Sequence, residues 1–222
     1  MKKRAILMSI FSLMAVLFFG CGKTTADYVK ENVAEITKTF CFAENENFYI
    51  TLASGQREKE YLLDGRAQPL TDFALLSVTF FDDIPSEIIN VEVTIDEEKR
   101  QVEMEYNPMT NSFLADLELL LNENEQIAVK YADQTLTLEN LSKNFVIDWQ
   151  QALNIAIKEL KTEIEKEKKY ANLNAEVYLK VLDKKANKFD NFFWCFTILN
   201  VKNESFSVII STTDGSVLAK TK

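Results

Sequence analysis

The stretch DWQQALNIAIKELKTEIEKEKKY, residues 148–170, marks the point where the hydrophobic pattern of the chain changes. Its apolar residues recur at every third or fourth position, which is the spacing of one face of an α-helix. Asp148 is a suitable N-cap, and Gln151 stands where a capping box needs it. Lysines collect at the C-terminal end, where they suit the helix dipole. We therefore predict a long helix here and a different organisation on either side of it.

Short apolar segments separated by turn residues fill the chain upstream of this helix, from residue 48 to residue 141. Residues 89–96 and 101–106 alternate apolar and polar side chains around a charged tip, which predicts a hairpin. Residues 112–121 fit either a strand or a helix. Short strands with turns about every 8–12 residues are typical of a β-sandwich, so we expect an Ig-like architecture. Residues 25–40 have apolar side chains at helical spacing, which predicts one short helix before the sandwich.

The chain downstream of the long helix returns to alternation. Three or four antiparallel strands are predicted, at residues 175–183, 191–201, 205–212 and 216–220. Alternation places Trp194 and Phe196 on the face that would pack under the helix. The opposite face would carry an apolar set that we mark as a candidate partner-binding face: Tyr178, Phe193, Leu199 and Ile209. The alternative is that this face packs on the β-rich part of the chain.

The last third of the chain resembles a PepSY-type module. Such modules begin with a helix of the W…A…IA kind, here Trp149, Ala152, Ile155 and Ala156. They end with a strand, a turn and a short last strand, here STTDGSVLA at residues 211–219. PepSY-type modules occur in secreted peptidase propeptides and in envelope proteins and are thought to bind or inhibit other proteins. The resemblance implies a binding or regulatory role without catalysis.

The first twenty residues have the layout of an export signal. A basic head at residues 2–4 precedes an uncharged apolar run at residues 5–19. That run is short for a membrane-spanning helix, which needs about 20 residues. Gly20 directly before Cys21 resembles the lipobox of bacterial lipoproteins, in which the thiol receives lipid and the signal is cut in front of it. The resemblance implies a lipid-anchored protein on the extracytoplasmic face of a cell membrane. Ordinary secretory cleavage, or an uncleaved anchor, is the alternative.

Together these patterns predict an α+β protein. We expect a signal peptide at 1–20, a lipidated tether at 21–25, a β-sandwich-like domain at 26–145 and a PepSY-like domain at 146–222. In the last domain the long helix would pack on a three- to four-stranded antiparallel sheet.

The composition narrows the function. The chain has 25 Lys and Arg against 34 Asp and Glu, a net charge of −9, which repels phosphate backbones and argues against nucleic acid as a partner. It contains no histidine, which removes Ser-His-Asp and Cys-His catalysis and His-ligated zinc. We expect a non-catalytic binding protein with no cofactor and no metal, whose partners are the membrane and an envelope protein or peptide.

Two alternatives and one cysteine question stay open. Carboxylates are plentiful, so a hydrolase with paired acids is one alternative, with Asp82 and Asp83 as the local candidates. A small solute-binding lipoprotein is the other. Residues 122–125 (NENE) offer oxygen ligands but lack the loop pattern of a calcium site. Cys41 and Cys195 can form a disulfide or stay as buried free thiols, and we expect the latter.

Overall fold

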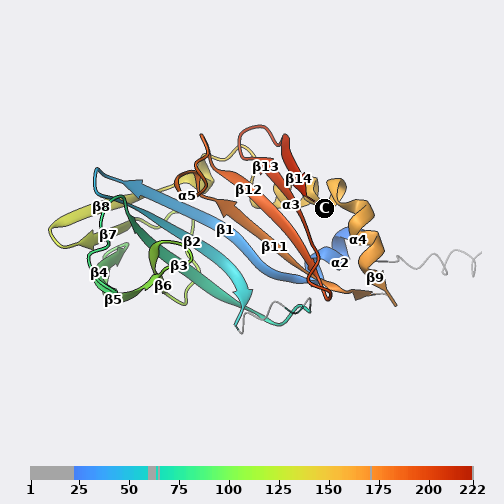
Figure 1. The fold of residues 1–222 in the computed structure, drawn as a ribbon, viewed down its shortest axis with the longest axis horizontal. Coiled ribbons are helices and arrows are strands. Elements are labelled where there is room, and N and C mark those ends of the chain that lie inside the picture. Colours follow the sequence, from blue (N-terminus) through green and yellow to red (C-terminus); the bar gives the residue numbers. More distant parts are fainter. Residues whose placement is uncertain (1–22, 60–63, 65, 171, 222) are drawn as a thin grey trace, which may run out of the picture.

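A computed structural model describes residues 23–59, 64, 66–170 and 172–221. Cys21 and the predicted signal peptide lie outside the described residues, as does most of the segment 60–65, for which the sequence predicts a strand. The fold is mostly β, with 52% of the described residues in strands and 17% in helices. Figure 1 shows an elongated molecule with a barrel at one end and the longer helices at the other.

Twelve of the described strands form one sheet, in the order β14-β13-β12-β11-β1-β2-β3-β6-β5-β4-β7-β8. Their bounds are β1 Val33–Glu44, β2 Phe48–Glu58, β3 Leu70–Phe80, β4 Ile88–Ile95, β5 Glu98–Asn107, β6 Ser112–Asp116, β7 Ile127–Tyr131, β8 Gln134–Asn140, β11 Ala175–Leu182, β12 Phe193–Asn200, β13 Ser205–Ser211 and β14 Val217–Thr221. The last strand of the order, β8, also pairs with β1, Cys41 lying opposite Asn140. The eight strands from β1 to β8 therefore close into an antiparallel barrel.

The interior of the barrel is filled by side chains. The largest of them are each at most 1% exposed: Phe48, Leu52, Leu76, Met104 and Phe113. Eight strands give an interior just wide enough for side chains to fill it. The barrel is therefore the hydrophobic core of this end of the molecule.

The predicted Ig-like sandwich followed by a helix on a separate small sheet is wrong. β11 pairs in parallel with β1, Ile36 lying opposite Leu179, so the four C-terminal strands extend the barrel sheet. A sandwich needs two sheets packed face to face. Local alternation is the same in a sandwich strand and in a barrel strand, and the two pairings of β1 join segments far apart in the sequence. The sequence pattern carries no signal for either pairing.

The predicted helix over residues 25–40 is wrong in its second half. Helix α2 covers Thr25–Glu31, begins at a capping box formed by Thr24 and Asp27, and ends at Asn32. β1 follows at once, with register shifts between Val33 and Glu35 and between Thr37 and Thr39. Each shift inserts one extra residue into the strand. The apolar residues around it are therefore three or four positions apart and not two. Bulges in a strand therefore imitated the spacing of a helix.

The long C-terminal helix is broken in two. α3 (Trp149–Glu159) begins at the predicted capping box of Asp148 and Gln151, and α4 (Lys161–Glu167) follows after a break at Leu160. Residues 168–169 form the short strand β9, which pairs with β10 (Asn172–Leu173). The remaining short helices are η1 (Leu141–Lys143) and α5 (Lys184–Asn187). In the described part of the chain, no helix is long and apolar enough to cross a bilayer.

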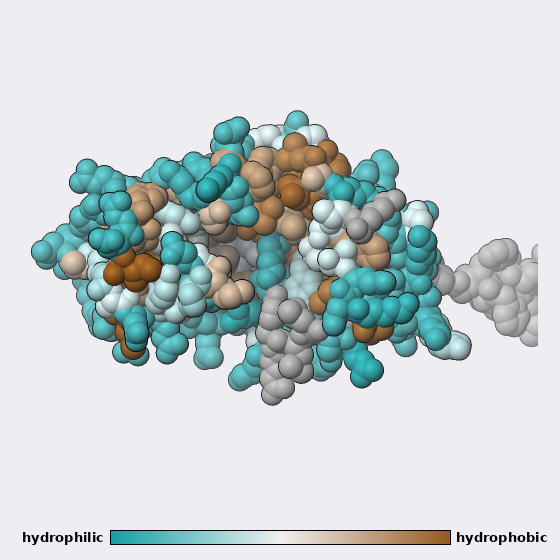
Figure 2. Space-filling view, viewed as in Figure 1, coloured by the Kyte–Doolittle hydropathy of each residue, from teal (hydrophilic) through white to brown (hydrophobic). Residues whose placement is uncertain are grey.

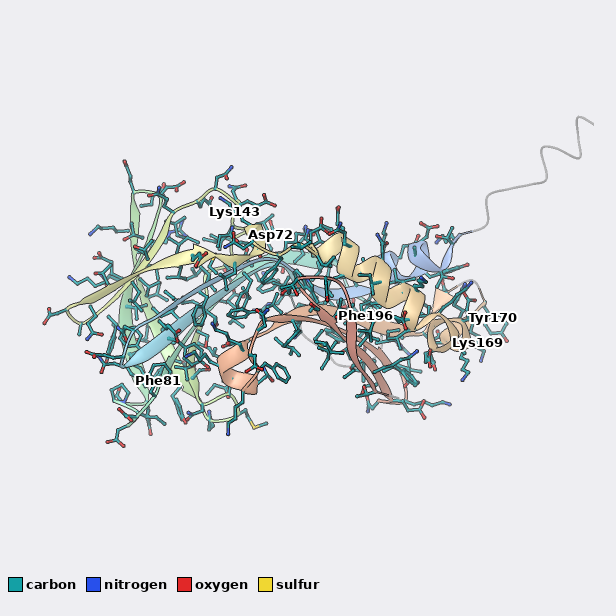
Figure 3. All side chains as sticks on the ribbon, turned by 90° about the horizontal axis from the view of Figure 1, so that it is seen from above. Asp72, Phe81, Lys143, Lys169, Tyr170 and Phe196 are labelled. Carbon is teal, nitrogen blue, oxygen red and sulfur yellow. The ribbon has the colours of Figure 1, made fainter. Side chains whose placement is uncertain are left out.

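Helices α2, α3 and α4 cover one face of the sheet extension. α3 contributes Ala152, Leu153, Ala156 and Ile157 to a core with Val177, Leu179, Trp194, Phe196, Ile198, Val208 and Ile210. Figure 3 shows Phe196 beneath α3. Trp194 and Phe196 thus lie on the face that the alternation predicted. Burying a large apolar side chain stabilises the fold by about 1.5–3 kcal/mol, so this layer fixes α3 firmly against the sheet.

Candidate functional site

A groove of about 460 Å³ lies where the N-terminal end of α3 meets strands β1, β2 and β3. It is lined by Lys30 of α2, by Val33, Ile36 and Lys38 of β1, by Gln56 of β2, by Leu70 of β3, and by Trp149, Gln150, Leu153 and Asn154 of α3. Side chains alternate along β2, so the face that lines the barrel at Leu52 meets α3 at Gln56. The groove therefore lies on the same face of β2 that lines the barrel interior. At this point the face is covered by α3 and no longer by the opposite strands of the barrel.

A β-bulge presents Lys38 to the groove. Thr37 lies opposite Gly55 and Thr39 lies opposite Ser54, which leaves Lys38 as the extra residue of β1. Gly55 permits this crossing because a Cβ at its position would lie 1.9 Å from the carbonyl oxygen of Ile36. Bulges commonly re-aim a side chain beside a functional site. The bulge and the glycine together place a lysine beside an apolar floor.

The Lys38 ammonium group lies between an amide and an aromatic ring. Its Nζ donates a hydrogen bond of 2.8 Å to Oε1 of Gln56 and lies 5.8 Å from the ring centroid of Trp149. Among the described residues, no carboxylate oxygen lies within 4.0 Å of this nitrogen. Gln56 in turn donates to Asp72 at 3.2 Å, and Figure 3 labels Asp72 near the start of α3. Lys38 is thus held in position without a counter-charge.

The rest of the groove lining consists of an apolar floor and of amide side chains on α3. Val33, Ile36 and Leu153 are buried and form the floor. Gln150 and Asn154 stand four residues apart on α3, so their amides share one side of the helix. None of the described lining residues is an acid or a cysteine. The described lining can therefore donate and accept hydrogen bonds and attract an anion.

A pair of buried carboxylates lies outside the groove. Glu176 of β11 is fully buried, and its Oε1 accepts hydrogen bonds from the backbone N–H groups of Asp64 (3.1 Å) and Arg66 (2.8 Å). Its other oxygen accepts from the hydroxyl of Tyr178. Glu58 of β2 is 1% exposed and accepts from the backbone N–H of Gln68. Both carboxylates are buried, and Oε2 of Glu58 has no hydrogen-bond partner among the described residues. Neither carboxylate lines the groove, so the groove gives the paired-acid hydrolase no support.

We expect Glu58→Gln to stabilise the protein at pH 7. Burial raises the pKa of the Glu58 carboxyl, and the nearby charges of Glu176 and Asp64 raise it further, while the N–H of Gln68 opposes them. A raised pKa in the folded state means that the wild-type protein loses stability as the pH rises through the range above the ordinary glutamate pKa. The gain should therefore be present at pH 7 and small at pH 4 in urea unfolding. Glu46→Gln, at an exposed position, is the control, and a variant less stable than wild type at both pH values would contradict the expectation.

The predicted partner-binding residues share one face of the sheet, opposite α3, but they do not form one continuous patch. Figure 2 shows a hydrophobic surface over β12 and β13, where Phe193 and Ile209 are half-buried. Tyr178 is only 6% exposed and is hydrogen-bonded to Glu176. Leu199 is separated from the other two by the hydrogen-bonded hydroxyls of Thr197 and Ser207, 2.9 Å apart. The face therefore offers a smaller apolar surface than the sequence suggested.

The other sequence candidates lie apart from the groove. Asp82 and Asp83 are exposed in the turn after β3. In the NENE segment, Glu125 accepts hydrogen bonds from Asn122, and among the described residues no group of three or more acidic or cysteine side chains is arranged to hold a metal ion. Cys21 lies outside the described residues.

Cys41 and Cys195 are both free thiols. Cys41 points into the barrel core, and burial raises its pKa to about 12. Burial also raises the pKa of Cys195, which lies half-buried on β12. Thiols of this kind are poor nucleophiles, so neither is placed for catalysis.

Sequence reasoning missed the groove because it read the β1 segment as helix. Lys38 stands in the run ITKTFCF, and a lysine within an apolar and β-branched run was the available signal. In the sequence, Trp149 is identified as the first residue of the PepSY-like helix; in the structure it packs against the core beneath α3 and, partly exposed, also forms a wall of the groove.

Comparisons with protein-family models, with curated proteins and with solved structures gave no match.

Proposed function

We propose that this protein is a non-catalytic binding module for a peptide or a protein segment, held by lipid at Cys21 on the extracytoplasmic face of a cell membrane. The observation that carries the binding role is the groove beside α3, which combines an apolar floor with lysine and amide groups and has no acid in its described lining. Its volume of about 460 Å³ is in the range of ligand sites. The lipobox-like sequence before Cys21 and the PepSY-like sequence after Trp149 support the same role.

A peptide fits the groove better than a small polar solute does. Val33, Ile36 and Leu153 can receive apolar side chains, and such burial is the main source of affinity. Gln56, Gln150 and Asn154 each carry both a donor and an acceptor, which is what the N–H and C=O groups of a peptide backbone require. A solute-binding protein would enclose its ligand, whereas this groove is only partly enclosed.

The test is selection of displayed random peptides against three forms of the protein. Asn154→Trp places a large ring over the groove at an exposed position of α3, and Lys158→Trp places the same ring on the same helix outside the groove lining. We expect peptides enriched on the wild-type protein to lose at least about tenfold in affinity on Asn154→Trp and to be retained on Lys158→Trp. Absence of any enriched peptide, or equal binding to Asn154→Trp, would show that the groove is not a peptide site.

The anchor is tested separately by mass spectrometry of the protein from its native membrane. We expect the mature chain to begin at Cys21 with acyl chains attached. An unmodified Cys21 would remove the membrane placement and leave the binding role to be judged by the peptide selection.

A further inference from the structure

We propose that the groove recognises a carboxylate on its ligand, that Lys38 receives it, and that the ligand is a peptide with a free C-terminus and an apolar last residue. This inference rests on the proposed function, because it takes the groove as the binding site. It adds the chemical group that the site selects.

Lys38 differs from other lysines of the sheet in having no carboxylate partner among the described residues. Several lysines of this protein that lie on the sheet have a carboxylate partner: Lys180 with Glu35 at 2.8 Å, Lys99 with Glu92 at 2.8 Å, and Lys220 with Glu163 at 3.8 Å. Lys38 is half-buried, and no described carboxylate oxygen is within 4.0 Å of it. Acids outnumber bases in the chain by 34 to 25, so carboxylates are abundant, yet the described groove lining contains none. The charge of the groove is complementary to an anion.

Lys38 is already held in place before a ligand binds. An ammonium group has three donors, and Gln56 accepts only one hydrogen bond of 2.8 Å from it. The Trp149 ring limits its movement on another side. The bulge at Thr37 and Thr39, opposite Gly55, fixes the backbone that carries it. A charged donor fixed before the ligand arrives binds an anion with little ordering cost.

The residues around Lys38 indicate which chemical groups lie next to the carboxylate of the ligand. Ile36 lies two residues from Lys38 in the same lining, and Leu153 and Val33 complete an apolar floor next to the charge. A peptide that ends in an apolar residue presents a carboxylate and an apolar side chain on one carbon atom. Gln150 and Asn154 can then pair with the preceding peptide groups, and Lys30 adds a second positive charge at the rim. A fatty acid shares the carboxylate and the apolar chain but has nothing for these amides to bind.

The experiment uses acetylated tripeptides ending in leucine, with either a free C-terminal carboxylate or a C-terminal amide, and sodium dodecanoate as a third probe. Binding is followed by tryptophan fluorescence and by calorimetry on the full chain. We expect the free acid to bind the wild-type protein at least tenfold more tightly than the amide, and dodecanoate to bind more weakly than the free acid. Lys38→Met should abolish the difference between acid and amide, whereas Lys130→Met, at an exposed lysine of β7, should leave it intact.

The outcomes separate this inference from the proposed function. Equal binding of acid and amide to the wild-type protein would overturn carboxylate recognition while the groove remained a peptide site. Tighter binding of dodecanoate than of either peptide would overturn the peptide class. If neither tripeptide binds and no displayed peptide is enriched, both the inference and the proposed function fail. The comparison on the wild-type protein needs no variant, so it decides the question even if Lys38→Met folds poorly.

Discussion

Gly55→Ala is expected to destabilise the folded protein by about 3 kcal/mol or more, at the upper end of what an added buried group costs. The new Cβ would lie 1.9 Å from the carbonyl oxygen of Ile36 and 3.1 Å from the backbone nitrogen of Lys38. These are backbone atoms of a strand that pairs with β2, β8 and β11, so the clash cannot be relieved by rotating a side chain. The measurement is urea unfolding followed by circular dichroism.

Thr51→Ala, in the same strand β2, is the matched control. Thr51 is half-buried and lies opposite Phe42, away from the bulge. We expect it to cost less than about 1 kcal/mol, because it removes a few atoms and introduces no clash. If Gly55→Ala unfolds at the same urea concentration as this control, the close crossing of β1 and β2 is not a requirement of the fold.

Trp194→Ala is expected to cost about 4 kcal/mol, in line with other removals of a buried aromatic ring. Trp194 is 1% exposed beneath α3, and its Nε1 donates a hydrogen bond of 2.8 Å to the carbonyl oxygen of Ile147. Its ring meets that of Phe145 edge to face at a centroid distance of 5.7 Å. Truncation removes the packing under α3, the contact with the Phe145 ring and the hydrogen bond to Ile147, which belongs to the segment that leads into α3. Far-UV circular dichroism in urea is the suitable probe, because fluorescence changes when a tryptophan is removed.

Two further variants separate the contributions of ring volume, hydrogen bond and burial to this loss of stability. Trp194→Phe keeps most of the ring volume and loses the hydrogen bond, so a loss of about 1–2 kcal/mol is expected. Trp149→Ala removes the other tryptophan, which is partly exposed at the groove, and should cost clearly less than Trp194→Ala. Equal losses at positions 149 and 194 would mean that burial under α3 does not determine the stability of this part of the protein.

The sequence predicted those features that depend on neighbours within one element. Asp148 and Gln151 form the capping box of α3, and Trp194 and Phe196 face the helix, because a capping motif and a strand alternation are local properties. The closure of β8 on β1 and the parallel pairing of β11 with β1 were not predictable in this way. They join residues about a hundred or more positions apart, for example Phe42 with Glu139 and Ile36 with Leu179, and no local pattern encodes a partner at that distance.

The groove was hidden for the same physical reason. Lys38 acquires its position from a bulge, and a bulge shifts the alternation that identifies a strand. Trp149 lies at the end of the apolar stripe of α3, where one ring can serve both the core and a surface site. The candidate face at Phe193 and Ile209 was found because it follows plain alternation, whereas the groove depends on an irregularity that only the three-dimensional pairing reveals.

The cap of α2 bears on how freely the molecule could move if Cys21 is acylated as proposed. Thr24 already belongs to the folded body, and only Gly22 and Lys23 separate it from Cys21 in the chain. At about 3.5 Å per residue, the chain between Cys21 and Thr24 can span roughly 10 Å at most. With so short a connection, the folded part of the protein would stay close to the membrane surface. Lys30 is on the same helix, so the groove would stay near the lipid headgroups and would meet chain ends that are themselves close to the membrane.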